Sequence, residues 1–189
     1  NILPITIVIP HRNRINEIKA CVKSIQALSS LPSKVHIIDD FSDAEEIKNL
    51  RLYISQIKNL NIILSSHNKH LGTSVAKNLG IQQAQTPYIW FLDSDTEFIE
   101  YDTLDIGFKI LEQNNNVGIA GAEIIRGPKD RFYLKEYYHL PNKWTACKNH
   151  LLESTIQKNV EILTTCNFLT RVELMTRIGG FNKELSTSE

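Results

Sequence analysis

The sequence has little cysteine and no long apolar run, and each absence excludes a class of protein. Cys21, Cys147 and Cys166 are far apart and lack Cys-x-x-Cys spacing, which argues against a disulfide framework and a zinc knuckle. No apolar run approaches the roughly 18 residues that span a membrane, and no basic start followed by an apolar core indicates a signal peptide. We therefore expect a cytoplasmic protein, with any membrane association peripheral and at the inner face.

An excess of one charge is also absent. The 21 basic and 21 acidic side chains cancel, so no bulk field attracts nucleic acid, which is not an expected partner. A length of 189 residues suits one domain, and 42% apolar with 22% charged residues is ordinary for a globular protein. A polyanionic ligand must therefore be recognised locally.

Apolar runs rich in β-branched and aromatic residues predict buried strands at 5–10, 35–39, 61–66 and 88–92. Helical spacing fills the intervals, at about 15–28, from Ser42 or Asp43 onward, and at 73–84. Later residues predict a helix at 103–113, strands at 116–125 and 160–165, and a short helix at 171–178, with 126–158 as an excursion over the site. This alternation predicts an α/β fold with a mostly parallel central sheet and helices on both faces.

Two acidic clusters end apolar strands, in VHIIDD at 35–40 and YIWFLDSD at 88–95. Because ligands bind outside the carboxyl ends of parallel strands, the clusters are expected to face one crevice. Asp93 and Asp95, two positions apart on a loop, offer hard oxygen ligands to Mg²⁺ or Mn²⁺. The alternative is structural: Asp39 and Asp40 would form a turn, and 93–95 would cap the next helix.

The order of motifs resembles the family 2 glycosyltransferases of GT-A fold, which bind nucleotide sugars. The resemblance lies in IVIPHRNR at 7–14, VHIIDDFSD at 35–43, the segment 67–98 that contains HNKHLGTSVAKN and FLDSD, and IGGFNKEL at 178–185. It covers nearly the whole chain. It implies a metal-dependent transferase that moves a sugar from a nucleoside diphosphate to a carbohydrate or glycolipid hydroxyl, in polysaccharide or glycoconjugate synthesis.

The resemblance also implies roles for individual residues. In the donor site, Pro10, His11, Arg12 and Asn13 would line the base and ribose, Asp40 would accept the uracil N3–H, Gly72 and Lys77 would lie under the diphosphate, and Asp93, Ser94 and Asp95 would form the Asp-x-Asp segment. Asp95 would contact Mn²⁺ or Mg²⁺, and Asp93 the ribose or a metal-bound water. The start IPHRNR is similar to that of animal-type galactosyltransferases, which favours a UDP-sugar.

The catalytic base is expected a few residues after Gly-Gly-Phe, in a Glu-Asp pair. Glu189 falls where that pair begins, so the base is expected just beyond it, and the alternative is that Glu189 is a solvated residue. We therefore expect residues 1–189 to be one GT-A domain and a fragment, with a nucleotide-binding half at 1–100 and an incomplete acceptor-side half at 101–189.

Two other functions stay open on the sequence alone. A nucleotidyltransferase has much of this architecture but carries a Gly-x-Gly-Thr-Arg loop after its first strand, and Pro10-His11-Arg12-Asn13 contains no glycine. A non-catalytic fragment that only binds nucleotide sugars would show the same donor motifs. His67 and His70 are close in sequence, but no further ligand pair accompanies them, so a zinc site is not expected.

Overall fold

The computed structural model describes residues 1–121 and 165–185. Its strands are β1 (Ile2–His11), β2 (Leu31–Asp39), β3 (Ile62–Ser66), β4 (Tyr88–Leu92), β5 (Ile119–Gly121) and β6 (Asn167–Arg171). Its helices are α1 (Ile15–Gln26), α2 (Ala44–Gln56), α3 (Thr73–Gln83), α4 (Thr103–Gln113) and α6 (Val172–Arg177), with a 3₁₀ turn, η1, at Lys183–Leu185.

The strands form one six-stranded sheet in the order β3-β2-β1-β4-β6-β5. The strands β1 to β4 run parallel to one another, with Ile7 level with both Val35 and Trp90. Strand β6 runs antiparallel to both β4 and β5. The four parallel strands are those that the apolar runs predict, so the prediction of a mostly parallel sheet is confirmed.

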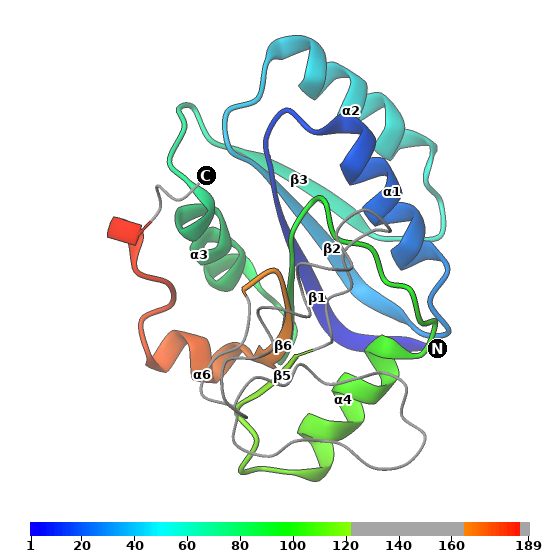
Figure 1. Ribbon diagram of the computed structural model, residues 1–189, viewed down its shortest axis with the longest axis vertical. Helices are drawn as coiled ribbons and strands as arrows, with labels where there is room; N and C mark the ends of the chain where they lie inside the picture. Colours follow the sequence, from blue (N-terminus) through cyan, green and yellow to red (C-terminus); the bar gives the residue numbers. More distant parts are fainter. Residues whose placement is uncertain (122–164, 186–189) are drawn as a thin grey trace, which may run out of the picture.

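Helices cover both faces of the sheet, as predicted (Figure 1). Along β1, alternate residues face opposite ways, because side chains in a strand alternate between the two faces. Ile7 packs in a core with α1, α2 and α4, whereas Val8 packs in a second core with α3 and α6. Each fully buried isoleucine or valine contributes about 1.5–3 kcal/mol.

Helix α3 lies unusually close to the sheet. A Cβ atom added to Gly80 would come within 2.5 Å of Val8 Cγ1, so only glycine permits this approach. The approach matters for the site, because the first turn of α3 reaches the carboxyl ends of β1 and β2.

Several predicted boundaries are wrong. Strand β1 begins at Ile2 rather than at residue 5, and α1 ends at Gln26, two residues before the predicted end. The strand predicted at 160–165 lies outside the described residues except for Thr165, which is in a turn, and the strand of this region is β6 at Asn167–Arg171. The excursion predicted at 126–158 also lies outside the described residues.

Candidate donor site

A cavity of about 460 Å³ lies at the carboxyl ends of β1, β2 and β4. Its lining is mostly polar and comes from the end of β1, the loops after β1, β2, β3 and β4, and the start of α3: Pro10, His11, Arg12, Asn13, Arg14, Asp40, His70, Gly72, Thr73, Asp93, Ser94 and Asp95. All the predicted donor-site residues except Lys77 are therefore brought together, and Asp40 and Asp95 share one crevice. Arg14, His70 and Thr73 were missed.

Asn13 links the loop after β1 to the loop after β2 by two hydrogen bonds. Its φ of +50° turns the chain sharply after β1, a conformation that asparagine tolerates better than most residues. Its amide N–H donates to Ser42 Oγ at 2.9 Å, and its Oδ1 accepts the Asp43 N–H at 2.8 Å. Asp43 does occupy the predicted N-cap position of α2, but it makes no side-chain cap bond. The Asn13 side chain instead accepts the N–H of the N-cap residue itself, from a neighbouring loop.

Asp40 is held by four partners. Its Oδ1 accepts the Leu71 N–H at 2.8 Å and lies 3.0 Å from His67 Nδ1, while its Oδ2 accepts the Gly72 N–H at 2.7 Å and lies 2.7 Å from His70 Nδ1. Burial raises the pKa of Asp40, but the hydrogen bonds from His67, Leu71 and Gly72 and the nearby His70 outweigh burial, so the net pKa is lowered. The carboxylate is therefore ionised at neutral pH.

The partners of Asp40 limit how its carboxylate could accept a hydrogen bond from a ligand. A carboxylate has roughly four acceptor positions, and the four partners account for them. The two backbone amides and His67, whose side chain is 10% exposed, are enclosed, whereas the His70 side chain is 43% exposed. A ligand N–H that reaches Asp40 must therefore replace the His70 contact. The His67 and His70 pair in the loop before Gly72 was the sequence signal for this arrangement.

Asp93 and Asp95 each form an ion pair with one cationic side chain. Asp93 Oδ1 lies 3.0 Å from Lys77 Nζ, which is buried and also donates to the Thr165 carbonyl at 2.8 Å. Asp95 Oδ2 lies 2.5 Å from Arg14 Nη1, and both of these side chains are about half exposed. Lys77 thus lies behind Asp93 instead of lining the cavity, and the cation that lines the cavity beside Asp95 is Arg14.

The structural alternative for the two acidic clusters is only partly right. Helix α4 begins at Thr103 with Asp102 in the N-cap position, so residues 93–95 cap no helix. Asp39 does form a turn, since both of its oxygens lie 3.3 Å from the Ser42 amide nitrogen. The turn-forming role therefore belongs to Asp39, and Asp40 and Asp95 face the cavity.

The carboxylates of Asp93 and Asp95 fit a divalent cation that is also bound by substrate phosphates. Among the described residues, no group of three or more histidine, cysteine, aspartate or glutamate side chains is arranged to hold a metal ion. Mg²⁺, however, is commonly bound by one or two carboxylates together with substrate phosphates. Asp93 and Asp95 both line the cavity, so the pair suits a cation that arrives with a phosphate ligand.

His11 is enclosed next to the cavity. Its side chain is fully buried, and its Nε2 lies 3.2 Å from Glu46 Oε1. Burial lowers the pKa of His11, opposed by the nearby charges of Asp39 and Glu17. The neutral imidazole therefore predominates at neutral pH.

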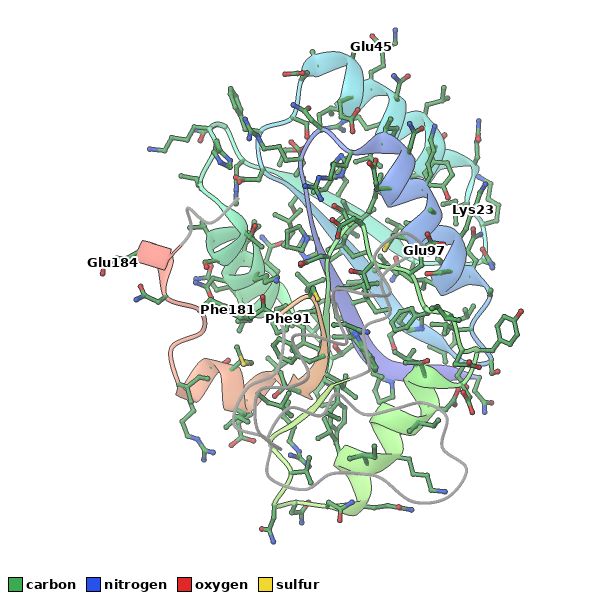
Figure 2. All side chains as sticks on the ribbon, in the orientation of Figure 1. Lys23, Glu45, Phe91, Glu97, Phe181 and Glu184 are labelled. Carbon is green, nitrogen blue, oxygen red and sulfur yellow. The ribbon has the colours of Figure 1, made fainter. Side chains whose placement is uncertain are left out.

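The Gly-Gly-Phe segment lies against α3. Asn78 Nδ2 donates to the Phe181 carbonyl and Asn78 Oδ1 accepts the Phe181 N–H, both at 2.8 Å. The Phe181 ring meets Phe91 edge-on with centroids 5.0 Å apart, and Figure 2 shows these two side chains facing each other. Glu184 points away from the fold into solvent in the same view. Glu189, the residue predicted nearest the base, lies outside the described residues.

No helix in the described part of the chain is both long and apolar enough to cross a membrane.

Solved structures with the same fold bind nucleotide sugars. A mannosyltransferase from Pyrobaculum calidifontis in complex with GDP-Man and Mn²⁺ superposes with a TM-score of 0.71 at 18% identity, over 96% of this chain and 48% of that one. TarS 1–349 of S. aureus in complex with UDP-GlcNAc gives a TM-score of 0.68 at 16% identity, over 95% of this chain and 49% of that one. These likenesses show the GT-A fold.

Curated relatives are similar over about 60% of this chain. An uncharacterized glycosyltransferase of Rickettsia conorii is 36% identical over 111 residues, which are 59% of this chain and 18% of that protein. A teichoic acid poly(glycerol phosphate) polymerase of Staphylococcus epidermidis is 28% identical over 116 residues, 61% of this chain and 15% of that protein. The chain therefore spans less than a fifth of the length of these relatives. The model of glycosyl transferase family 2 matches residues 6–179, nearly the whole chain, and the protein belongs to that family.

Proposed function

We propose that the protein transfers a sugar from a uridine diphosphate sugar to an acceptor hydroxyl, with inversion at the sugar carbon and with Mn²⁺ or Mg²⁺ as cofactor. The acceptor oxygen forms a bond to the sugar carbon, the bond to the diphosphate oxygen breaks, and the acceptor proton passes to a base. The observation that carries this proposal is the cavity in which Asp40 and Asp95 meet, after the ends of β2 and β4, the two parallel strands on either side of β1.

The cavity divides into a base end and a phosphate end. Asp40 and the turn 10–13 would receive the uracil and ribose, because Asp40 is an ionised acceptor. The first turn of α3 would receive the diphosphate, since Thr73 lines the cavity and a helix N-terminus favours anions. Gly72, with φ of +88°, allows the chain to turn into α3 beside the ligand. Ser94, which is buried in the lining, would complete this wall.

Asp95 and Asp93 would hold the cation. When bound, the cation neutralises the negative charge that develops on the departing diphosphate. Lys77 keeps the Asp93 carboxylate in place from behind, through the 3.0 Å contact and its own bond to Thr165. Asp93 would therefore be the more constrained of the two ligands, and Asp95, which is half exposed, the more accessible one.

We propose that residues 1–189 are one domain, with the nucleotide in the half formed by 1–100 and the acceptor against residues 101–189. The base would follow Phe181 in sequence, at or after Glu189. We also propose a carbohydrate or glycolipid acceptor in polysaccharide or glycoconjugate synthesis, because one relative is a teichoic acid poly(glycerol phosphate) polymerase.

The donor assignment is tested by two aspartate variants. Asp40→Ala should weaken UDP binding with or without Mn²⁺, because it removes a base contact. Asp95→Ala should weaken mainly the Mn²⁺-dependent part, because it removes a ligand of the cation. Calorimetric titration with UDP, with and without Mn²⁺, measures both effects.

The control is Asp102→Ala, which removes an exposed carboxylate of α4 that makes no cap bond. It should bind UDP as the unaltered protein does. Identical behaviour of the Asp40 and Asp95 variants would contradict the assignment. Normal UDP and Mn²⁺ binding without any sugar transfer or donor hydrolysis by the full-length protein would instead support a non-catalytic nucleotide-sugar-binding module.

A further inference from the structure

The two carboxylates of the Asp-x-Asp segment are neutralised in different ways. The Asp93 partner, Lys77, is 2% exposed and also bonded to Thr165. The Asp95 partner, Arg14, has a side chain that is 54% exposed and lies in the cavity wall. Breaking a buried pair leaves an unpaired buried charge and is strongly unfavourable, whereas an exposed pair contributes little to stability. Only the Arg14 contact is therefore easily exchanged.

The backbone of Arg14 is fixed although the tip of its side chain is not. Its carbonyl accepts the Ile18 N–H at 2.9 Å at the start of α1, and its amide hydrogen-bonds to Glu46. The preceding residue, Asn13, is bonded to the loop before α2. A guanidinium that leaves Asp95 therefore stays within reach of the same cavity.

We propose that Arg14 is a positioning residue that exchanges partners when the donor binds. Without ligands, the Arg14 guanidinium forms an ion pair with the Asp95 carboxylate. A diphosphate in the cavity draws the guanidinium away, because its planar fork matches phosphate oxygens, and Asp95 becomes free for the divalent cation. The inference rests on the proposed function and adds to it a coupling between the nucleotide and the metal.

The exchange has a measurable consequence. A cation alone must compete with Arg14 for Asp95, whereas a cation that follows the diphosphate does not. UDP should therefore raise the affinity for Mn²⁺ by more than the direct metal–phosphate contact provides, and by linkage Mn²⁺ should raise the affinity for UDP by the same factor. This coupling factor separates partner exchange from a simple change of charge, which would shift both affinities and leave the factor unchanged.

The experiment compares Arg14→Ala with the unaltered full-length protein. Mn²⁺ affinity is measured by electron paramagnetic resonance, alone and at saturating UDP, and UDP affinity is measured by calorimetry. In Arg14→Ala we expect Mn²⁺ alone to bind about two- to fivefold more tightly, UDP alone to bind about three- to tenfold more weakly, and the coupling factor to fall about two- to fivefold.

Two further variants make the test specific. Arg14→Lys keeps the charge and loses the fork, so its coupling factor should lie between those of the unaltered protein and Arg14→Ala. Arg51→Ala removes an exposed arginine of α2 outside the cavity lining, and it should change none of the three quantities.

The outcomes separate the two proposals. UDP and Mn²⁺ binding with an unchanged coupling factor in Arg14→Ala overturns the exchange and leaves the proposed function standing. Weaker Mn²⁺ binding by Arg14→Ala also overturns it, because Arg14 would then support the metal site. Absence of UDP binding by the unaltered protein overturns the proposed function and the exchange together.

Discussion

At the scale of single residues, His36 shows how one buried side chain makes stability depend on pH. It is 1% exposed in the centre of β2, and its Nε2 lies 2.8 Å from Ser65 Oγ. Burial, followed by the charge of Lys34, lowers the pKa of His36 to about 4. Between that value and the ordinary 6.5, the unfolded chain binds a proton that the folded chain does not. The stabilising contribution is therefore complete above pH 6.5 and is lost as the pH falls toward 4.

We expect His36→Gln to reduce this pH dependence. Urea unfolding of the unaltered protein should show a loss of stability between pH 7 and pH 5 that exceeds the loss in His36→Gln by up to about 2 kcal/mol. Ser65→Ala, which removes the hydrogen-bond partner and keeps the imidazole, should retain the steeper dependence. Equal slopes in His36→Gln and the unaltered protein would show that His36 is not the group responsible.

The residues of the donor site divide into those that sequence could and could not predict. Asp40 and Asp95 were predictable, because each follows an apolar strand and parallel strands end at one edge. Arg14 was not, since its pairing with Asp95 joins two loops that are distant in sequence. Lys77 was predicted to lie under the diphosphate, but it lies behind Asp93 and outside the cavity lining, in a position that depends on the distant Thr165 carbonyl.

At the scale of elements, α3 connects the donor cavity to the late Gly-Gly-Phe segment. Lys77 and Asn78 are consecutive, and one holds Asp93 while the other holds both backbone groups of Phe181. Gly179 and Gly180 both have positive φ, of +84° and +76°. A Cβ atom on Gly180 would meet Asn78 Oδ1 at 2.3 Å, whereas one on Gly179 would meet nothing within 4 Å.

This pair of glycines permits a matched test of the Asn78 contact. Gly179→Ala should cost about 1–2 kcal/mol of stability from backbone strain alone. Gly180→Ala should cost about 1–3 kcal/mol more, because it also displaces Asn78. Urea unfolding measures both, and in an Asn78→Ala background the extra cost of Gly180→Ala should largely disappear. Equal losses of stability in the two glycine variants would mean that the Asn78 side chain moves aside without a measurable cost.

The elements differ in how well sequence predicts them. Strands β1 to β4 have long apolar runs that must be covered on both faces, and these were predicted. Strand β6 has the short sequence NFLTR, and its antiparallel direction is set by pairing with β4 and β5. Its strand character comes from those partners rather than from local pattern, which is why no strand was predicted at 167–171.

At the scale of the whole molecule, the cavity joins segments that are far apart in sequence, so a ligand in it should stabilise the entire fold. At a UDP concentration 100 times the Kd in the presence of Mn²⁺, linkage gives about 2.7 kcal/mol. For a domain of this size, that corresponds to a rise in Tm of roughly 5–10 °C. Thermal unfolding with UDP should show this rise, and GDP at the same concentration should produce a smaller one. A larger shift with GDP would argue for a guanosine donor.

The buried contacts of Lys77 and Asn78 also have a consequence for how the protein folds during synthesis. Lys77 bonds to a residue 88 positions later, and Asn78 to one 103 positions later. Contacts of such long separation form late, because the chain entropy of closing the loop must be overcome first. On the ribosome, the parallel strands β1 to β4 can emerge and pair well before residue 181 is available. The wall of the cavity behind Asp93 is therefore completed last, and the nascent chain should gain nucleotide affinity only after the Gly-Gly-Phe segment has emerged.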